Sequence, residues 1–116
     1  MQELIEQYRS LVQHQHVREY DTPGDRHTVR LELIFSDQSR LIVYESRFYD
    51  TGRFKYSYQW MTKTNELIHR WDNAHEVPLP TSSHHQHIGS EDNVQPSEPM
   101  TLTDVRTIIA QHITSG

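Results

Sequence analysis

Histidine is the residue type whose placement in this sequence most directly indicates chemistry. His84, His85 and His87 fall within four consecutive positions, and His75 precedes them in the same stretch of the chain. Imidazole transfers protons near neutral pH, and it is also the commonest metal ligand in proteins. Arg70 lies just before this stretch and adds a fixed cation. We therefore take residues 69–89 as the candidate functional segment.

Metal-independent cleavage of RNA is one chemistry that these residue types could perform. It requires a base for the 2′-hydroxyl, an acid for the leaving oxygen and a cation for the charge that develops at phosphorus. We expect acid and base among the four histidines, with His75, His85 and His87 preferred. Arg70 would bind phosphate, and Asp72 would orient an imidazole. The expected further substrate contacts are Arg47, Lys55, Tyr58 and Asn73.

Two other interpretations stay open at this point. His75, His85 and His87, with Asp72, could supply nitrogen and oxygen ligands to zinc or a similar ion, although no HExxH spacing supports this. Histidines in a polar loop also often do no more than hydrogen-bond the backbone. On the acid–base interpretation we expect no cofactor.

Composition and charge exclude several classes of protein. The chain of 116 residues has no cysteine, which excludes disulfides, a thiolate nucleophile and Cys-ligated zinc. No apolar run approaches the ~20 residues of a membrane helix, and the charged N-terminus is not a signal peptide, so we expect a cytoplasmic prokaryotic protein. The net charge of −5 arises entirely after residue 70, where the sequence has six acidic residues and one basic residue, Arg106. A duplex-binding protein usually shows the opposite balance.

Hydrophobic periodicity predicts a single α+β domain over residues 1–116. Apolar positions from Leu4 to Val12 recur at helical spacing and predict an N-terminal helix over residues 1–16. Alternating residues and short turns predict an antiparallel four-stranded meander within residues 27–72. Residues 73–100 read as an irregular His-rich segment, and residues 101–114 read as a closing helix that starts in a capping box. The predicted strands are 27–36, 40–48, 53–62 and 66–71.

Two further expectations concern the sheet. The alternating stripe of Tyr56, Tyr58 and Trp60 could stack on bases, but the alternation favours the core-facing side of a strand. An exposed edge strand could pair with a second copy of the chain, which would give a homodimer.

Several segments, in their order along the chain, resemble the TumE family of prokaryotic toxins between Val29 and Ile109. Two departures from the family pattern fall in the histidine segment. Ser83 stands where the family tends to have proline, and Gln86 stands where a basic residue is often found. Asp72-Asn73-Ala74 also runs directly into His75 without the usual proline. The matching segments are Phe35–Leu41, Glu45, Lys55–Tyr58, Ile68–Ala74, His84–Gly89, Val94–Ser97 and the last helix.

The resemblance implies the toxin of a type II toxin–antitoxin pair, whose partner is typically a helix-turn-helix DNA-binding antitoxin. A basic partner of that kind would complement the acidic C-terminal part of the chain. A ribonuclease is the natural activity by analogy with other small toxins. The alternatives are a non-catalytic module that sequesters a partner and a histidine-site metal-binding protein. The acidic residues in question are Glu91, Asp92, Glu98 and Asp104.

Overall fold

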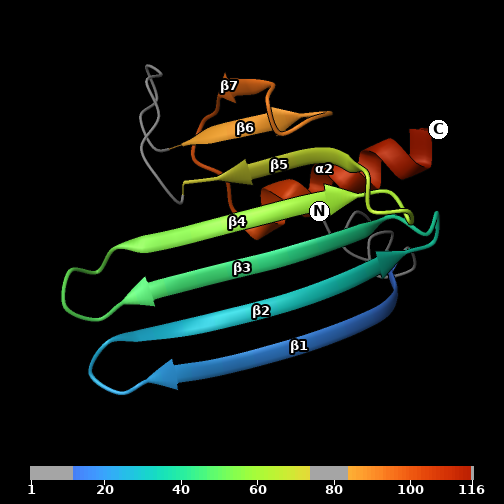
Figure 1. Cartoon of the computed structure of the whole chain (residues 1–116). Helices are drawn as coiled ribbons and strands as arrows, with labels where there is room; N and C mark the ends of the chain where they lie inside the picture. Colours follow the sequence, from blue (N-terminus) through green and yellow to red (C-terminus); the bar gives the residue numbers. More distant parts are fainter. Residues whose placement is uncertain (1–11, 74–83, 116) are drawn as a thin grey trace.

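Seven antiparallel strands and one helix make up the described part of the chain (Figure 1). The computed structural model describes residues 12–73 and 84–115. The strands follow one another in the sheet in their order along the chain, so each pairs with its sequence neighbours. The elements are β1 (Val12–Thr22), β2 (Arg26–Phe35), β3 (Arg40–Phe48), β4 (Phe54–Met61), β5 (Leu67–Asp72), β6 (His85–Ile88), β7 (Val94–Pro96) and α2 (Leu102–Ser115).

Short turns impose the antiparallel order, because parallel neighbours would need long crossover connections. The turn between β2 and β3 places Gln38 in the left-handed region, with φ of 71°. Its neighbour Asp37 accepts hydrogen bonds from the backbone N–H and the hydroxyl of Ser39. Gly52 supplies the left-handed residue of the next turn, with φ of 69°.

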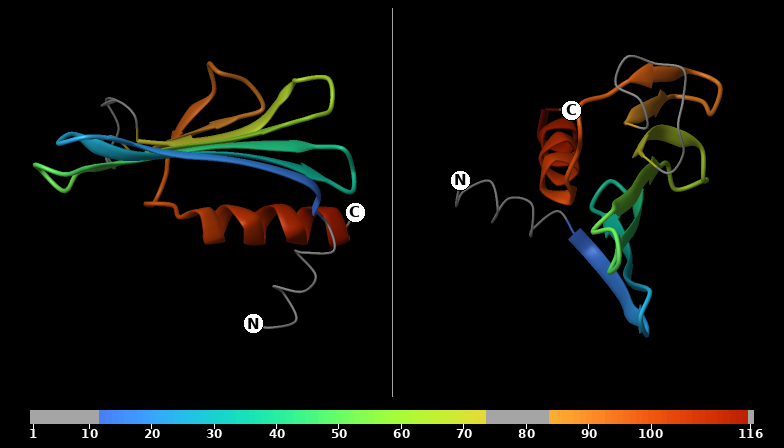
Figure 2. Two further views of the ribbon diagram at one scale, coloured as in Figure 1. Left: turned by 90° about the horizontal axis from the view of Figure 1, so that it is seen from below. Right: turned by 90° about the vertical axis from the view of Figure 1, so that its left-hand side faces the viewer.

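Helix α2 covers one face of the sheet, as both views in Figure 2 show. It starts in a capping box: the Thr101 backbone N–H donates to the Asp104 carboxylate, and the Asp104 N–H donates to the Thr101 hydroxyl. Val105 and Ile109 are fully buried against the strands. The buried core cluster is Leu31, Leu33, Phe35, Leu41, Val43, Tyr56, Tyr58, Trp60, Trp71, Val105 and Ile109.

Several predictions are confirmed. The antiparallel strands predicted over 27–72 appear as β2 to β5, and the closing helix appears as α2. Tyr56, Tyr58 and Trp60 are at most 4% exposed, so this stripe is a core face and not a platform for bases. No helix in residues 12–73 and 84–115 has the length and apolar character needed to span a membrane.

The predicted four-stranded meander is wrong, because β6 and β7 extend the sheet into the stretch predicted to be irregular. β6 reads His85-Gln86-His87-Ile88, so polar side chains occupy both of its faces. Hydrophobic alternation, on which strand prediction relies, is therefore missing from it. Pairing with β5 supplies the backbone hydrogen bonds that make it a strand.

The predicted N-terminal helix is also wrong where the structure describes it. Residues 12–16 belong to strand β1, while residues 1–11 lie outside the described residues. Val12, the last apolar position of the helical pattern, pairs with Phe35 of β2 and packs against the core. Residues 12–16 have only a weak preference for helix or strand, and their backbone hydrogen bonds to β2 make them part of a strand. The described fold is thus mostly sheet, with one helix.

Strand β1 forms a long edge that is exposed along almost its whole length. A cluster of charged side chains ties it to β2 at its C-terminal end. His27 of β2 lies 2.7 Å through Nδ1 from Asp21 and 2.8 Å through Nε2 from Glu19. The Tyr49 hydroxyl also donates to Asp21. These hydrogen bonds, to Asp21 first and then to Glu19, raise the pKa of His27.

The cluster predicts a pH-dependent contribution to stability. A raised folded-state pKa means that protonated His27 stabilises the fold fully below its unfolded-state pKa, and that this contribution is lost as the pH rises through the folded-state pKa. We expect wild type and His27→Gln to differ most in unfolding free energy at mildly acidic pH and to converge at alkaline pH. Urea unfolding across that range measures the difference, and a pH-independent difference would contradict the role given to His27.

Candidate active site

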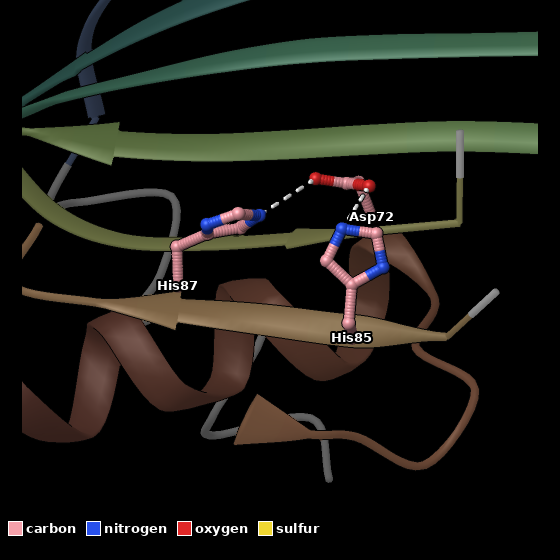
Figure 3. Close-up of side chains that lie close together, drawn as sticks. All are labelled: Asp72, His85 and His87. Carbon is pink, nitrogen blue, oxygen red and sulfur yellow. Dashed lines mark ion pairs between the residues drawn. The ribbon is translucent and has the colours of Figure 1, made fainter. Parts of the chain in front are cut away.

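The register between β5 and β6 gathers the predicted site residues on one face of the sheet. Asp72 pairs with His85, and Arg70 pairs with His87. Cross-strand partners point to the same side of a sheet, so all four side chains lie together. Figure 3 shows Asp72 of β5 facing both histidines of β6, on the face opposite α2.

Asp72 is the centre of this cluster. Its Oδ1 lies 2.8 Å from Nε2 of His85, and its Oδ2 accepts a hydrogen bond of 3.0 Å from Nε of Arg70. Oδ2 also lies 3.7 Å from Nε2 of His87. Asp72 is 2% exposed and His85 is not exposed at all. A carboxylate buried to this extent requires such polar partners, because removing it from water is costly.

His87 is held in one tautomer by its two hydrogen bonds. Nδ1 lies 2.8 Å from the backbone carbonyl of Glu91, which can only accept. Nε2 lies 2.9 Å from Nη2 of Arg70, which can only donate. The proton therefore sits on Nδ1, and Nε2 presents its lone pair. An imidazole in this state can act as a base through Nε2.

A bidentate ion pair between Arg70 and Glu91 covers the cluster. Nη1 of Arg70 lies 2.9 Å from Oε1 of Glu91, and Nη2 lies 2.8 Å from Oε2. The Glu91 side chain is 56% exposed, whereas that of Arg70 is 19% exposed. The planar guanidinium fork fits phosphate as well as carboxylate. Glu91 therefore occupies an arginine edge that a phosphate group could take.

Of the two other predicted histidines, the structure describes His84, which lies apart from the cluster. His84 shares a hydrogen bond of 2.8 Å with the Tyr56 hydroxyl, and the two rings stack. Tyr56 belongs to the core face, so His84 lies on the other side of the sheet from His85 and His87. His84 immediately precedes β6, and its contact with Tyr56 separates it from its neighbour His85. His75 lies outside the described residues.

Of the expected substrate contacts, only Lys55 shares a face with the cluster, through the register of β3 and β4. Tyr58 is buried and donates a hydrogen bond of 2.6 Å to Glu45, and burial raises its pKa strongly. Arg47 lies over the ring of Phe54 on the face that α2 covers. The side-chain amide of Asn73 bonds the backbone of β4, accepting from the N–H of Tyr56 and donating to the carbonyl of Phe54.

Glu91 is a site residue that the sequence did not reveal. The sequence places it only among the acidic residues expected to complement a basic partner, whereas in the structure it pairs with Arg70 and its backbone carbonyl fixes the tautomer of His87. The spacing His87-x-x-x-Glu91 carries no such signal by itself. The two residues meet because the chain turns at Gly89, with φ of 75°, between β6 and β7.

The cluster also has the composition of a metal site. Asp72, His85 and His87 each offer one ligand atom, and these atoms all lie within 4.8 Å of one another. Two histidines and a carboxylate suit several divalent transition metals. However, the Arg70 guanidinium already donates to two of these three side chains. A cation bound there would have to displace this positive charge, which favours proton transfer over metal binding.

A protein-family model matches this chain. The model of the family described as "Toxin TumE" matches residues 1–113, nearly the whole chain. No match was found among curated proteins or among solved structures.

The geometry predicts unequal stability effects at the two carboxylates. Asp72→Asn removes the buried negative charge and replaces one of the two acceptor oxygens by an NH2 donor, so either Arg70 or His85 loses its acceptor and we expect a loss of about 2–3 kcal/mol in unfolding free energy. Glu91→Gln removes a largely exposed partner, and its cost should stay within about 1 kcal/mol. Urea denaturation at neutral pH compares them. Equal effects would contradict Asp72 as the structural centre of the site.

Proposed function

The chain belongs to the TumE family, the toxins of toxin–antitoxin pairs, and we propose that it cleaves RNA with His87 as base and His85 as acid. The observation that carries this proposal is the buried cluster of two histidines, a carboxylate and an arginine on one sheet face. These are the groups that metal-independent cleavage requires.

The proposed reaction gives each histidine one proton transfer. Nε2 of His87 takes the proton of a ribose 2′-hydroxyl, and the 2′-oxygen attacks the adjacent phosphorus. The bond from phosphorus to the 5′-oxygen breaks, and His85, in its imidazolium form, donates a proton to that oxygen and becomes neutral. The products are a 2′,3′-cyclic phosphate and a 5′-hydroxyl. Asp72, 2.8 Å from Nε2 of His85, is a positioning residue that orients the acid.

Arg70 supplies the charge stabilisation in this proposal. A scissile phosphate would replace the Glu91 carboxylate on the guanidinium fork, because both anions suit bidentate pairing. Moving Arg70 toward the phosphate would also withdraw Nη2 from Nε2 of His87, where it now donates. Substrate binding would thereby release the lone pair that acts as the base. Glu91 would keep the site closed until substrate arrives.

A metal centre is the second candidate function, favoured by the ligand atoms of Asp72, His85 and His87 within 4.8 Å of one another. In that case a bound divalent ion would activate water or polarise phosphate. Arg70 would then have to leave the cluster when the ion binds. This consequence separates the two candidates experimentally.

The antitoxin is the partner that family membership implies, and we propose that it is a basic helix-turn-helix protein. The acidic residues of the C-terminal part are exposed and could pair with it by charge complementarity. Glu91 belongs both to this acidic surface and to the cover of the site. A partner bound there would therefore block access to Arg70. The acidic residues are Glu91, Asp92, Glu98 and Asp104.

Growth after induction of the chain alone tests the proposed roles. We expect wild type to arrest bacterial growth, and His85→Gln and His87→Gln to relieve the arrest, because glutamine can hydrogen-bond but cannot transfer protons. Each change should slow cleavage by purified protein by about 10²–10⁴-fold. His112→Gln, on α2 and away from the cluster, is the matched control. Full toxicity of both site variants, at equal protein level and with native circular dichroism, would sink the proposal.

Metal analysis separates the two candidates. On the acid–base proposal, untagged protein dialysed against zinc and manganese retains far less than one ion per chain, and EDTA leaves cleavage unchanged. A metal centre would instead retain about one ion per chain and raise the melting temperature, because binding to the folded state alone stabilises it. Arg70→Leu should increase metal retention only if these residues form a true metal site.

A further inference from the structure

A continuous row of side chains crosses the open face of the sheet and ends at the site. Each member pairs with the next on the neighbouring strand, from β1 to β6. Neighbouring strands lie about 5 Å apart, so the middle of the row on β3 is roughly 10 Å from the strand that carries Asp72. Within the described residues, α2 covers the other face (Figure 2). The row is Arg18, Arg30, Tyr44, Ser57, Asp72 and His85.

Charge is divided between the two faces of the described strands. On strands β1 to β4, the face opposite α2 carries one carboxylate, that of Glu32, and it forms an ion pair with Arg40. The face toward α2 instead carries Glu19, Asp21 and Glu45 beside Arg47. The protein as a whole has a net charge of −5, yet the part of this face that β1 to β4 form is basic. The cations of that face on β1 to β4 are Arg18, Arg26, Arg30, Arg40 and Lys55.

Aromatic rings lie among these cations. Arg30 lies 5.0 Å from the ring centroid of Tyr44, and Arg18 lies 5.6 Å from that of Tyr20. Hydrogen bonding from Arg30 also lowers the pKa of Tyr20, which is 38% exposed. Further along the face, Arg26 and Lys55 lie over the ring of Phe48. Alternating rings and cations suit a ligand that has both flat apolar groups and negative charges.

We infer that this open face binds a single-stranded stretch of RNA and leads it along the row toward the Arg70–Glu91 pair, which covers the buried Asp72 and His85. The inference rests on the proposed function and adds the place and form of the substrate. Phosphates would pair with Arg30 and Arg18, while an unstacked base would stack against Tyr44. Base pairing and stacking in a duplex hide the faces of the bases from such rings, so single strands are favoured. An acidic protein segment would use the cations but not the stacking.

Binding by the full chain tests this inference. Every variant carries His87→Gln, which slows cleavage, and the probe is a fluorescein-labelled oligouridine of about 12 nucleotides, followed by anisotropy. Tyr44→Leu should weaken binding at least about fivefold, the effect of one lost stacking contact. Arg30→Gln should lower the slope of log affinity against log salt by about 0.7, one phosphate contact. Arg30 is exposed, so this variant should keep the native fold.

Two matched variants control for charge. Lys63→Gln removes an exposed cation in the turn after β4, and it should leave affinity and salt slope unchanged. Arg47 lies over Phe54 at 5.0 Å, the same geometry as Arg30 over Tyr44, but on the face toward α2. Arg47→Gln should therefore weaken binding less than Arg30→Gln. The same RNA annealed to its complement should bind more weakly than the single strand.

The outcomes separate this inference from the proposed function. Wild-type affinity in both Tyr44→Leu and Arg30→Gln, or equal affinity for single strand and duplex, would overturn the inference. The two surface variants would also be assayed for RNA cleavage with His87 left native. If Tyr44→Leu and Arg30→Gln then cleave RNA as fast as wild type, the inference is overturned and the proposed function is supported. Binding that depends on Tyr44 and Arg30, with no cleavage by wild type, would support the RNA surface and overturn the catalytic proposal.

Discussion

Asp72 imposes the constraint around which the site is organised. A carboxylate at 2% exposure is stable only with strong partners, and Arg70 and His85 take one oxygen each. Arg70 and Asp72 lie on the same face of β5, whereas the contact with His85 depends on the pairing of β5 with β6, since a shift of one residue would move the histidines to the other face. The register of β5 and β6 therefore also determines which side chains lie beside Asp72. Arg70 then links Asp72 to His87 and Glu91, which joins the buried groups to the surface.

The two faces of the sheet have separate tasks. The face toward α2 holds the aromatic and aliphatic core, and Tyr58 is fully buried there. The opposite face holds the catalytic candidates and most of the sheet's cations, although Arg47 lies on the face toward α2, so a single-layer sheet can have a core on one side and a charged surface on the other. On the proposed function, this division would let a protein of net negative charge bind RNA on one face. Acidic groups in the C-terminal part remain available to an antitoxin.

Much of the sheet and of the site could be predicted from sequence because it depends on local patterns. Alternation revealed β2 to β5, and residue type alone indicated Asp72, His85, His87 and Arg70. The prediction of an N-terminal helix is wrong at Val12. An apolar residue there fits both the helical and the strand periodicity, and only its pairing with β2 makes it part of a strand. Strand β6 was missed because its side chains are polar on both faces. Long-range register placed His84 and Arg47 on the far face and Glu91 over the site, and no local pattern encodes that register.

The chemistry of the cleaved ends tests the catalytic claim most directly. Purified full-length protein would be incubated, with EDTA present, with an oligonucleotide that has one ribonucleotide in a DNA background and with its all-deoxy counterpart. Mass spectrometry would identify the products. Attack by the 2′-oxygen predicts a 2′,3′-cyclic phosphate and a 5′-hydroxyl from the first substrate, with the all-deoxy strand left intact. Three results would contradict the acid–base roles of His85 and His87. The first is cleavage of both oligonucleotides, and the second is products that carry a 5′-phosphate. The third is that neither oligonucleotide is cleaved and that the protein also cleaves no other RNA.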